Sequence, residues 1–153
     1  SKVYVSDRLD WRLKLAEKFG GIPIDIAADD PAAQVVRQTG GRGVDIAIEA
    51  AWADQSVQQA VDMARIGGRL VIVGISSDDR IAFDHATSRR KGLTIAMCRR
   101  MKHVYGRSIE LVHSGKVDLK SMVSHHMSID EASKAFAINA AYEDQVVKIA
   151  LHA

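Results

Sequence analysis

Asp7 is the residue in this chain whose type and position carry the most chemical information. It follows the β-branched run KVYVS, which predicts a strand over Lys2–Ser6. An acid at the carboxyl end of such a strand lies on the ligand-binding edge of an α/β sheet, where it can accept hydrogen bonds from both hydroxyls of an adenosine ribose. Its charge would repel a 2′-phosphate, which favours NAD over NADP. Arg12 lies one and a half turns further along and could reach the same ribose. Two simpler interpretations stay open: Asp7 only turns the chain into the next helix, and Arg12 lies in solvent.

The run Gly43–Ile75 indicates the architecture that must position these residues. Val44–Glu49 and Leu70–Val73 are short apolar runs, typical of parallel strands buried on both faces. Between them, apolar residues recur at helical spacing, and Gly67-Gly68 is expected to end that helix. Two such strands joined by a helix form a βαβ unit, which is almost always right-handed.

The rest of the chain continues the alternation of strands and helices. Trp11–Phe19 is expected to be a helix capped by Asp10, with Trp11, Leu15 and Phe19 facing inward, and Asp30 is expected to cap a second helix. These patterns predict an α/β fold with a doubly wound parallel (Rossmann-type) sheet and a C-terminal strand-helix-strand tail. The further expected elements are an edge strand Ile22–Ile26, a helix Pro31–Gln38, a loop Ser76–Asp84, a strand Leu93–Cys98, a helix Val104–Ser114 burying Val104, Ser108, Leu111 and Val112, a strand Met122–Met127, a helix opened by a capping box at Ser128–Glu131, and a strand Val146–Leu151.

The glycine motif expected of a dinucleotide-binding fold is absent. No G-x-G-x-x-G follows the first predicted strand, and Gly41-Arg42-Gly43 precedes a strand, so it is interpreted as a turn. The sheet is therefore expected to lack its first strand, together with the glycine loop and helix that follow it. In the order 3-2-1-4-5-6 that strand lies in the middle, so Val3–Ser6 and Val44–Glu49 each lose a neighbour. Either these two strands pair directly or another chain supplies a strand.

Composition limits the classes of partner. The net charge is +2, with 21 basic and 19 acidic residues spread along the chain, which argues against nucleic acid as a partner. No apolar run reaches the length of a membrane span, so no membrane partner is expected. A single cysteine fits a reducing compartment, and a cytoplasmic location is predicted.

No residue set predicts a metal centre or a catalytic nucleophile within the chain. His125 and His126 are adjacent and would point to opposite faces of a strand, so they cannot both bind one metal ion. The other histidines lack the spacing or the cysteine partner of a zinc site. Cys98 stands beside Arg99, which could lower the pKa of a thiol, but no base accompanies it.

Six segments, in order, resemble one known family. They are VYVSDRLDWRLKLAEKFG, GVDIAIEA, GGRLVIVGI, RRKGLTIAMCRR, YGRSIELVHSGKVDLKSMVSHHMSIDEASKAF and VVKIAL. Together they resemble the C-terminal part of the zinc-dependent medium-chain alcohol or polyol dehydrogenases, most closely the sorbitol dehydrogenase-like branch. The resemblance implies hydride transfer between an alcohol or polyol and NAD(P), and a catalytic zinc held by a mostly N-terminal domain that these residues do not include. It implies no catalytic and no metal-binding residue here, and a cofactor site of Asp7, Arg12, Ala50, Ala51, Val73, Gly74, Ile75, Cys98 and Arg99.

The expected organisation is a partial dinucleotide-binding domain over residues 1–120 and a tail, 121–153, that in relatives returns to the catalytic domain. Three functions stay open. The chain is a fragment of an NAD-dependent dehydrogenase, inactive alone, whose zinc is bound elsewhere; or it is an adenosine-ligand module, including a methyltransferase-type sheet; or it is an assembly module. Relatives pair the strand equivalent to Leu93–Cys98 across a two-fold axis, so a homodimer through that strand is predicted.

Overall fold

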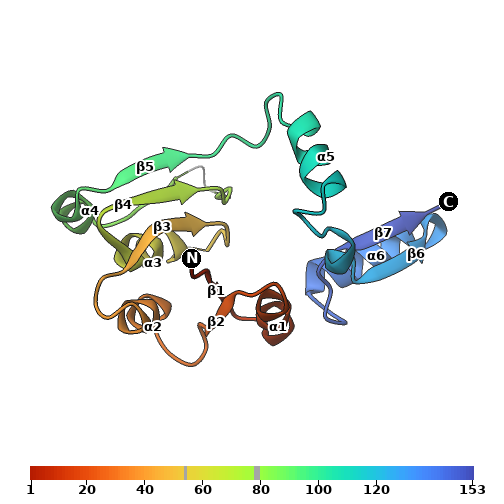
Figure 1. The fold of residues 1–153 in the computed structure, drawn as a ribbon. Coiled ribbons are helices and arrows are strands. Elements are labelled where there is room, and N and C mark those ends of the chain that lie inside the picture. Colours follow the sequence, from red (N-terminus) through yellow and green to blue (C-terminus); the bar gives the residue numbers. More distant parts are fainter. Residues whose placement is uncertain (54, 78–79) are drawn as a thin grey trace. The chain divides into compact units, whose positions relative to one another are not determined.

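The computed structural model describes residues 1–53, 55–77 and 80–153, and they form two compact units, Ser1–Arg100 and Met101–Ala153 (Figure 1). Every strand pair in both units is parallel. Helices alternate with the strands along the chain, which confirms the predicted α/β class. Among the described residues, no helix combines the length and apolar character needed to cross a bilayer.

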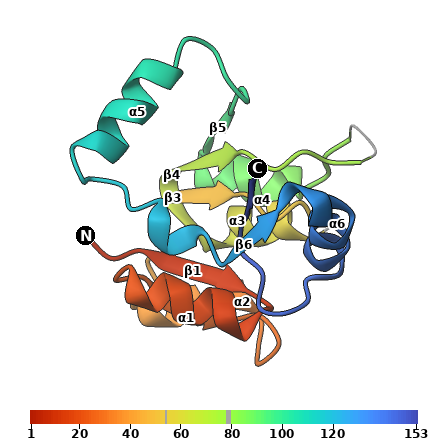
Figure 2. The same cartoon turned by 90° about the vertical axis from the view of Figure 1, so that its right-hand side faces the viewer.

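The first unit begins with a two-stranded sheet, β1 (Tyr4–Asp7) and β2 (Ile22–Asp25), joined by α1 (Asp10–Lys18). The helix and β2 supply the buried residues Leu13 and Ile24. The inward face predicted for α1 was wrong at Phe19, which is 49% exposed, and it omitted Leu13, which is buried. Trp11 and Leu15 are partly buried. The predicted cap was also wrong: Leu9 is the N-cap residue and makes no side-chain cap bond, while the Asp10 carboxylate pairs with Lys14. Figure 2 shows α1 packed along this sheet.

Helix α2 (Pro31–Gln38) has the predicted bounds. Asp30 Oδ1 accepts a hydrogen bond from the Ala33 amide at 2.9 Å, and Pro31 occupies the first turn, where its missing N–H costs nothing. The start of this helix is therefore determined by residues adjacent in the sequence.

A second sheet has the order β3 (Val44–Glu49), β4 (Ala64–Ile72), β5 (Thr94–Met97), so β5 is an edge strand. Helix α3 (Ser56–Met63) packs on one face. The core between them is apolar and consists of Ala47, Val57, Ala60, Val61, Ala64, Leu70 and Ile72. Burying this apolar surface stabilises the unit, by about 25 cal/mol per Å².

The predicted end of the central helix was wrong. Helix α3 stops at Met63, and Gly67-Gly68 lie inside β4. The reason is distant in sequence: Lys91, the last residue of α4 (His85–Lys91), donates from Nζ to carbonyls at the end of α3. Its acceptors are the carbonyl oxygens of Val61, Asp62 and Ala64, at 2.9, 2.7 and 2.8 Å. Helix α4 was itself not predicted.

The expectation that β3 is buried on both faces was also wrong. Ala47 and Glu49 are buried on the side of α3, whereas Ile46 and Ile48 are 55% and 65% exposed. Side chains alternate across a strand, so these two isoleucines lie on the face of the sheet opposite α3. Furthermore, β1 and β3 belong to different sheets, so the direct pairing of these strands did not occur.

The second unit contains α5 (Tyr105–His113), a 3₁₀ turn η1 (Lys120–Met122), β6 (His125–Ser128), a 3₁₀ turn η2 (Ile129–Glu131), α6 (Ala132–Ala141) and β7 (Ile149–His152). Both strands begin three residues later than predicted, and the strand-helix-strand order is confirmed. Ser128 Oγ accepts from the Asp130 amide and caps η2 rather than α6.

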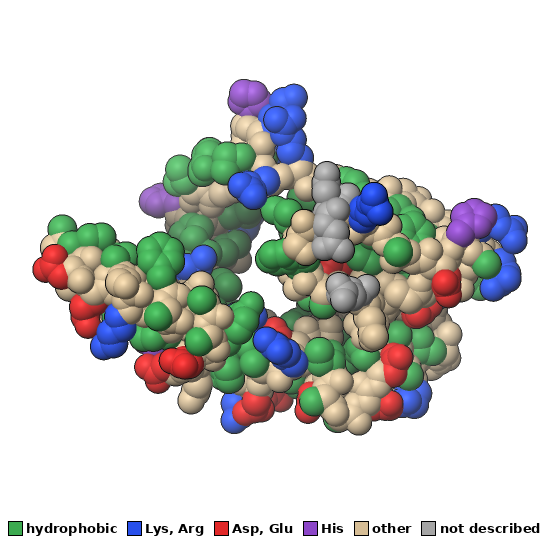
Figure 3. All heavy atoms as spheres, turned by 180° about the vertical axis from the view of Figure 1, so that it is seen from behind, with side chains coloured by type: hydrophobic (Ala, Val, Ile, Leu, Met, Phe, Trp, Pro, Cys, Tyr) green, Lys and Arg blue, Asp and Glu red, His purple; other side chains and the backbone are tan. Residues whose placement is uncertain are grey.

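The burial predicted for the helix Val104–Ser114 was wrong. No residue of α5 is buried, and its apolar residues Leu111 and Val112 are each 38% exposed. An amphipathic stripe is buried only where another element packs on it. Ser108 instead bonds the Val104 carbonyl through its hydroxyl. Figure 3 shows acidic and basic side chains interspersed on the visible face, in keeping with the small net charge.

Candidate functional site

The candidate site lies where the parallel strands of the first unit end. Asp7 is the last residue of β1, Glu49 the last of β3, and Gly74 and Cys98 follow β4 and β5. Ligands of open α/β sheets bind outside these carboxyl ends. Four of the nine residues proposed for the cofactor site, Asp7, Arg12, Ala50 and Ala51, line one cavity of about 1110 Å³. This cavity, the β1–β3 slot, lies between the two sheets.

Asp7 holds the turn after β1 and faces Arg12. Its Oδ1 accepts a hydrogen bond from the Leu9 amide at 2.9 Å, and its Oδ2 lies 3.7 Å from Arg12 Nη1. The turn-forming role is therefore present in the structure. It uses only one carboxylate oxygen, and a carboxylate offers about four acceptor sites, so the side chain keeps capacity for ribose hydroxyls.

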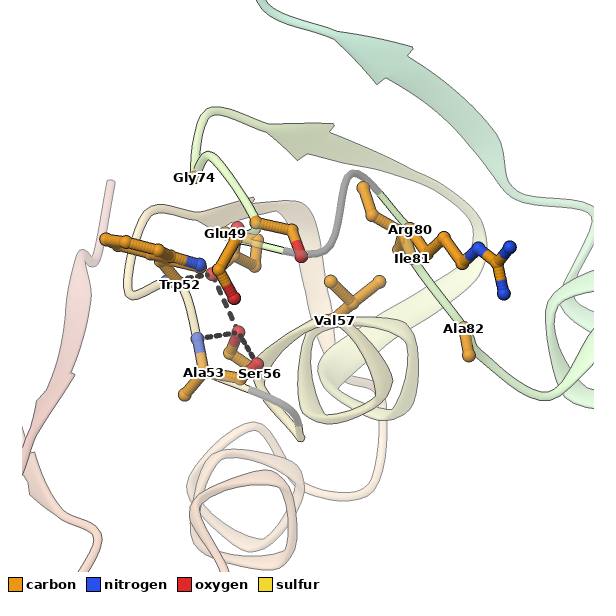
Figure 4. Close-up of a pocket in the computed structure, with 11 residues that line it drawn as sticks. Glu49, Trp52, Ala53, Ser56, Val57, Gly74, Arg80, Ile81 and Ala82 are labelled. Atoms are coloured by element: carbon orange, nitrogen blue, oxygen red, sulfur yellow. Dashed lines mark hydrogen bonds between the residues drawn. The ribbon is translucent and has the colours of Figure 1, made fainter.

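Glu49 is the residue that sequence reasoning missed. Its side chain is buried and its Oε1 accepts three hydrogen bonds, from the Ala51 amide at 2.9 Å, the Trp52 amide at 2.9 Å and Ser56 Oγ at 2.7 Å (Figure 4). These bonds fold the β3–α3 loop against the start of α3. The sequence did contain a signal for Glu49, because it is an acidic residue at the end of an apolar strand, as Asp7 is.

Glu49 and Ser56 also line a second cavity, of about 540 Å³, with Trp52, Gly74 and Arg80. Figure 4 shows Trp52 and Ser56 close to the Glu49 carboxylate, with Arg80 on the far side of the pocket. A Cβ at Gly74 would collide with Glu49 Oε2, and the Val73 and Gly74 amides both donate to the Glu49 carbonyl. Glu49 therefore accounts for the glycine at position 74 without a ligand.

The other proposed cofactor residues are not brought into these cavities. Val73 and Ile75 flank Gly74 and are 42% and 57% exposed. Cys98 is exposed, and its amide donates to the Ile72 carbonyl at 2.8 Å. Arg99 follows it and is exposed. These four residues share the strand-end edge with Gly74 but lie outside the linings of both cavities.

Comparison with known proteins identifies the family. The sequence profile described as "Zinc-binding dehydrogenase" matches residues 1–114. The chain belongs to the zinc-binding dehydrogenase family. The "Putative D-xylulose reductase" of Rhizobium meliloti (strain 1021) is 34% identical over 156 residues, which cover 100% of this chain and 45% of that protein. The sorbitol dehydrogenase of Bacillus subtilis (strain 168) is 28% identical over 151 residues, covering 98% of this chain and 43% of that protein.

Among solved structures, a "putative zinc-binding dehydrogenase" of Sinorhizobium meliloti 1021 bound to NADP has a TM-score of 0.90 and 25% identity. The alignment covers 100% of this chain and 45% of that one. The predicted resemblance to zinc-type alcohol and polyol dehydrogenases is confirmed. The chain spans less than half the length of the curated relatives it matches.

The zinc that the family name implies does not fit the residues described here. In residues 1–53, 55–77 and 80–153, no three His, Cys, Asp or Glu side chains are grouped as metal ligands would be. His125 bonds Asp144 and Ser124, while His126 stacks on His152 with Nδ1 2.7 Å from Nε2. The adjacent histidines thus have different partners. That the isolated chain holds no stoichiometric zinc stays a prediction.

Proposed function

We propose that the chain is the cofactor-binding part of an NAD-dependent oxidoreductase that transfers hydride between an alcohol or polyol and NAD. The observation that carries the proposal is Asp7, which closes β1 at the edge of the β1–β3 slot with Arg12 beside it. The names of the relatives, a xylulose reductase and a sorbitol dehydrogenase, favour a polyol as the substrate class.

The residues of this chain would bind and orient the cofactor. Asp7 would accept hydrogen bonds from both hydroxyls of the adenosine ribose, and Arg12, 3.7 Å away, would fix the carboxylate and cover the adenosine. The backbone of Val73–Ile75 and the strand end at Cys98–Arg99 would lie nearer the nicotinamide. Bound NAD supplies the hydride acceptor.

Catalytic groups and zinc would come from a part of the enzyme outside these residues. The chain alone would therefore oxidise no alcohol. We also place the enzyme in the cytoplasm, because Cys98, the single cysteine of these 153 residues, is a free thiol.

The methyltransferase-type alternative is disfavoured by the tail. Sheets of that type close with an antiparallel hairpin, whereas β6 and β7 pair in parallel and are connected through α6. The adenosine-binding and assembly alternatives differ from the dehydrogenase in what they predict: under either of them, the complete protein would not oxidise an alcohol.

The test is a fusion in which the upstream part of the Rhizobium meliloti relative precedes this chain. We expect the fusion to bind NADH, measured by fluorescence titration, and to oxidise a polyol with NAD. The isolated chain should show no turnover. A fusion that folds, binds zinc and has no affinity for NADH would contradict the proposal.

A further inference from the structure

Trp52 has an unusual backbone conformation for a bulky residue. Its φ is 54°, in the left-handed region, where the Cβ of any residue other than glycine is crowded by the backbone. Among the described residues of the first unit, every other residue with a positive φ is a glycine. A strained conformation persists only where the surrounding structure holds it, and strained residues are concentrated at ligand sites.

Glu49 holds Trp52 in this conformation. The amides of Ala51 and Trp52 both donate to Glu49 Oε1, each at 2.9 Å. Ser56 Oγ lies 2.7 Å from the same oxygen and accepts a hydrogen bond from the Ala53 amide at 3.2 Å. The residues on both sides of Trp52 are therefore held in place, and bonds to a buried carboxylate are stronger than bonds between neutral groups.

The indole of Trp52 does not offset this strain by burial. It is 60% exposed, more than any other phenylalanine, tyrosine or tryptophan side chain in the described part of the first unit. A single exposed ring is ordinary on a protein surface. Here, however, the exposed ring is attached to a backbone conformation that lowers stability, so packing within the fold does not explain the residue.

The indole lies at the edge of the sheet where the strands end. Trp52 follows the last residue of β3 by three positions and lines the second cavity, while Ala51 lines the β1–β3 slot with Asp7. Glu49 lines both cavities. Figure 4 shows the indole beside the Glu49 carboxylate, on the side away from Arg80. Trp52 is therefore next to the slot in which the cofactor ribose would bind.

The ligand chemistry that suits an exposed indole is a flat aromatic ring. Nucleobases stack on aromatic side chains, and stacking requires no hydrogen bond to the base. Adenine is joined directly to the ribose that Asp7 would bind, so it must lie close to that carboxylate. The nicotinamide ring is separated from this ribose by the pyrophosphate and a second ribose. Adenine is therefore the ring of the cofactor that Trp52 is placed to contact.

We propose that Trp52 is a further binding residue of the cofactor site, and that its indole, held in the left-handed conformation by Glu49, stacks on the adenine ring of NAD. This inference rests on the proposed function, because it requires the adenosine ribose to bind at Asp7. The two residues would have different roles. Asp7 would set the preference between NAD and NADP, whereas Trp52 would contribute to the affinity for either, because both carry adenine.

Trp52→Gly in the full chain separates a role in binding from a role in folding. Glycine adopts the left-handed conformation without crowding. The released strain opposes the greater freedom of glycine in the unfolded chain, so we expect the urea midpoint of the first unit to stay the same or rise. Trp11 remains in the variant and belongs to the same unit, so its fluorescence reports the unfolding.

Binding is measured on the fusion with the upstream part of the Rhizobium meliloti relative, by titration with NADH. Trp52→Gly should weaken NADH binding at least fivefold, the lower end of what stacking contributes. Trp52→Phe keeps an aromatic ring and should bind within about threefold of the unmutated fusion. Phe19→Ala is the control: Phe19 is also exposed but lies just before β2, at the opposite edge of the sheet, and its loss should leave binding unchanged.

Competition by the two halves of the cofactor identifies the ring that Trp52 contacts. AMP carries the adenine and nicotinamide mononucleotide carries the other ring. Displacement of NADH from the fusion gives a dissociation constant for each. Trp52→Gly should raise the dissociation constant of AMP at least fivefold and leave that of nicotinamide mononucleotide unchanged. It should also leave the ratio of kcat/KM for NAD to that for NADP unchanged.

Three results would overturn the proposal: an unchanged affinity for NADH in Trp52→Gly, a loss for nicotinamide mononucleotide as large as that for AMP, or a fall in the urea midpoint. A fusion that binds NADH with a preference that depends on Asp7, but without any effect of Trp52→Gly, would overturn this inference alone. A fusion that folds and does not bind NADH would overturn the proposed function as well, so the two failures are distinguishable.

Discussion

The Glu49 carboxylate occupies the space that a side chain at position 74 would need. Its Oε2 lies against Gly74, while its Oε1 binds the loop that leads into α3. The ends of β3 and β4 are therefore joined by a buried acid and a residue without a side chain.

Gly74→Ala should destabilise the first unit by about 1–3 kcal/mol, because the added methyl must displace a carboxylate that holds three hydrogen bonds. Both tryptophans, Trp11 and Trp52, lie in this unit, so urea unfolding followed by tryptophan fluorescence reports on it alone.

The same substitution in a Glu49→Ala background provides the control. With the carboxylate gone, the cost of Gly74→Ala should fall below about 0.5 kcal/mol. If Gly74→Ala destabilises the unit equally in both backgrounds, Glu49 is not the reason that position 74 requires glycine.

Lys91→Met should destabilise the first unit by about 1–3 kcal/mol. Its ammonium donates to three carbonyls at the end of α3. Methionine keeps the apolar stem of the side chain, but the three carbonyl oxygens lose their charged hydrogen-bond donor. Burial lowers the pKa of Lys91, so part of the gain is already offset by desolvation.

Arg90→Met is the matched control for Lys91. Arg90 is the preceding residue and is exposed, so its loss should change the free energy of unfolding by less than about 0.5 kcal/mol. Equal effects of the two variants in urea unfolding would argue against the capping role of Lys91.

These contacts explain which parts of the fold could be predicted from sequence. Helix α2 was predicted to the residue because Asp30 and Pro31 are local signals, and β3 because its apolar run is bounded by Gly43. The end of α3 was missed because Lys91 follows Val61 by 30 positions.

In the candidate site, too, one residue could be predicted from the sequence and another could not. Asp7 was found because an acid ending a strand is visible in the sequence, and the structure places it on a cavity with Arg12. The role of Glu49 depends on Gly74 approaching it from β4, a contact that no local pattern reveals.

Asp45 should make the stability of the first unit depend on pH. Hydrogen bonds from Arg42 and Arg65, at 2.6 Å each, hold the pKa of the Asp45 carboxyl well below its usual range. A carboxyl whose pKa is lower in the folded state stabilises it above the unfolded pKa, about 3.9, and loses that contribution as the pH falls below it.

The Tm difference between the unmutated chain and Asp45→Asn should therefore be largest near neutral pH and shrink between about pH 4 and pH 2. Because Asp45 is exposed, 1 M salt should reduce the difference at neutral pH. A difference that grew on acidification would contradict the assignment.

The edge strand β5 should mediate a homodimer. Thr94–Met97 pairs only with β4 among the described strands, and its outer edge is apolar. Sedimentation at micromolar concentration should give a dimer, and Ile95→Pro should give monomer or aggregate. A monodisperse monomer for the unmutated chain would refute this assembly.

Cofactor preference of the fusion described above tests the central claim most directly. The measurement is the ratio of kcat/KM for NAD to that for NADP, before and after Asp7→Ser. Serine can still accept the Leu9 amide bond, so the turn is preserved while the charge is removed. Asp10 is an exposed acid in the next helix, so Asp10→Ser is the control.

We predict that the unmutated fusion prefers NAD. Asp7→Ser should lower the ratio of kcat/KM for NAD to that for NADP by roughly tenfold or more, and Asp10→Ser should leave this ratio unchanged. Faster turnover with NADP in the unmutated fusion, or a ratio unaffected by Asp7→Ser, would contradict the account.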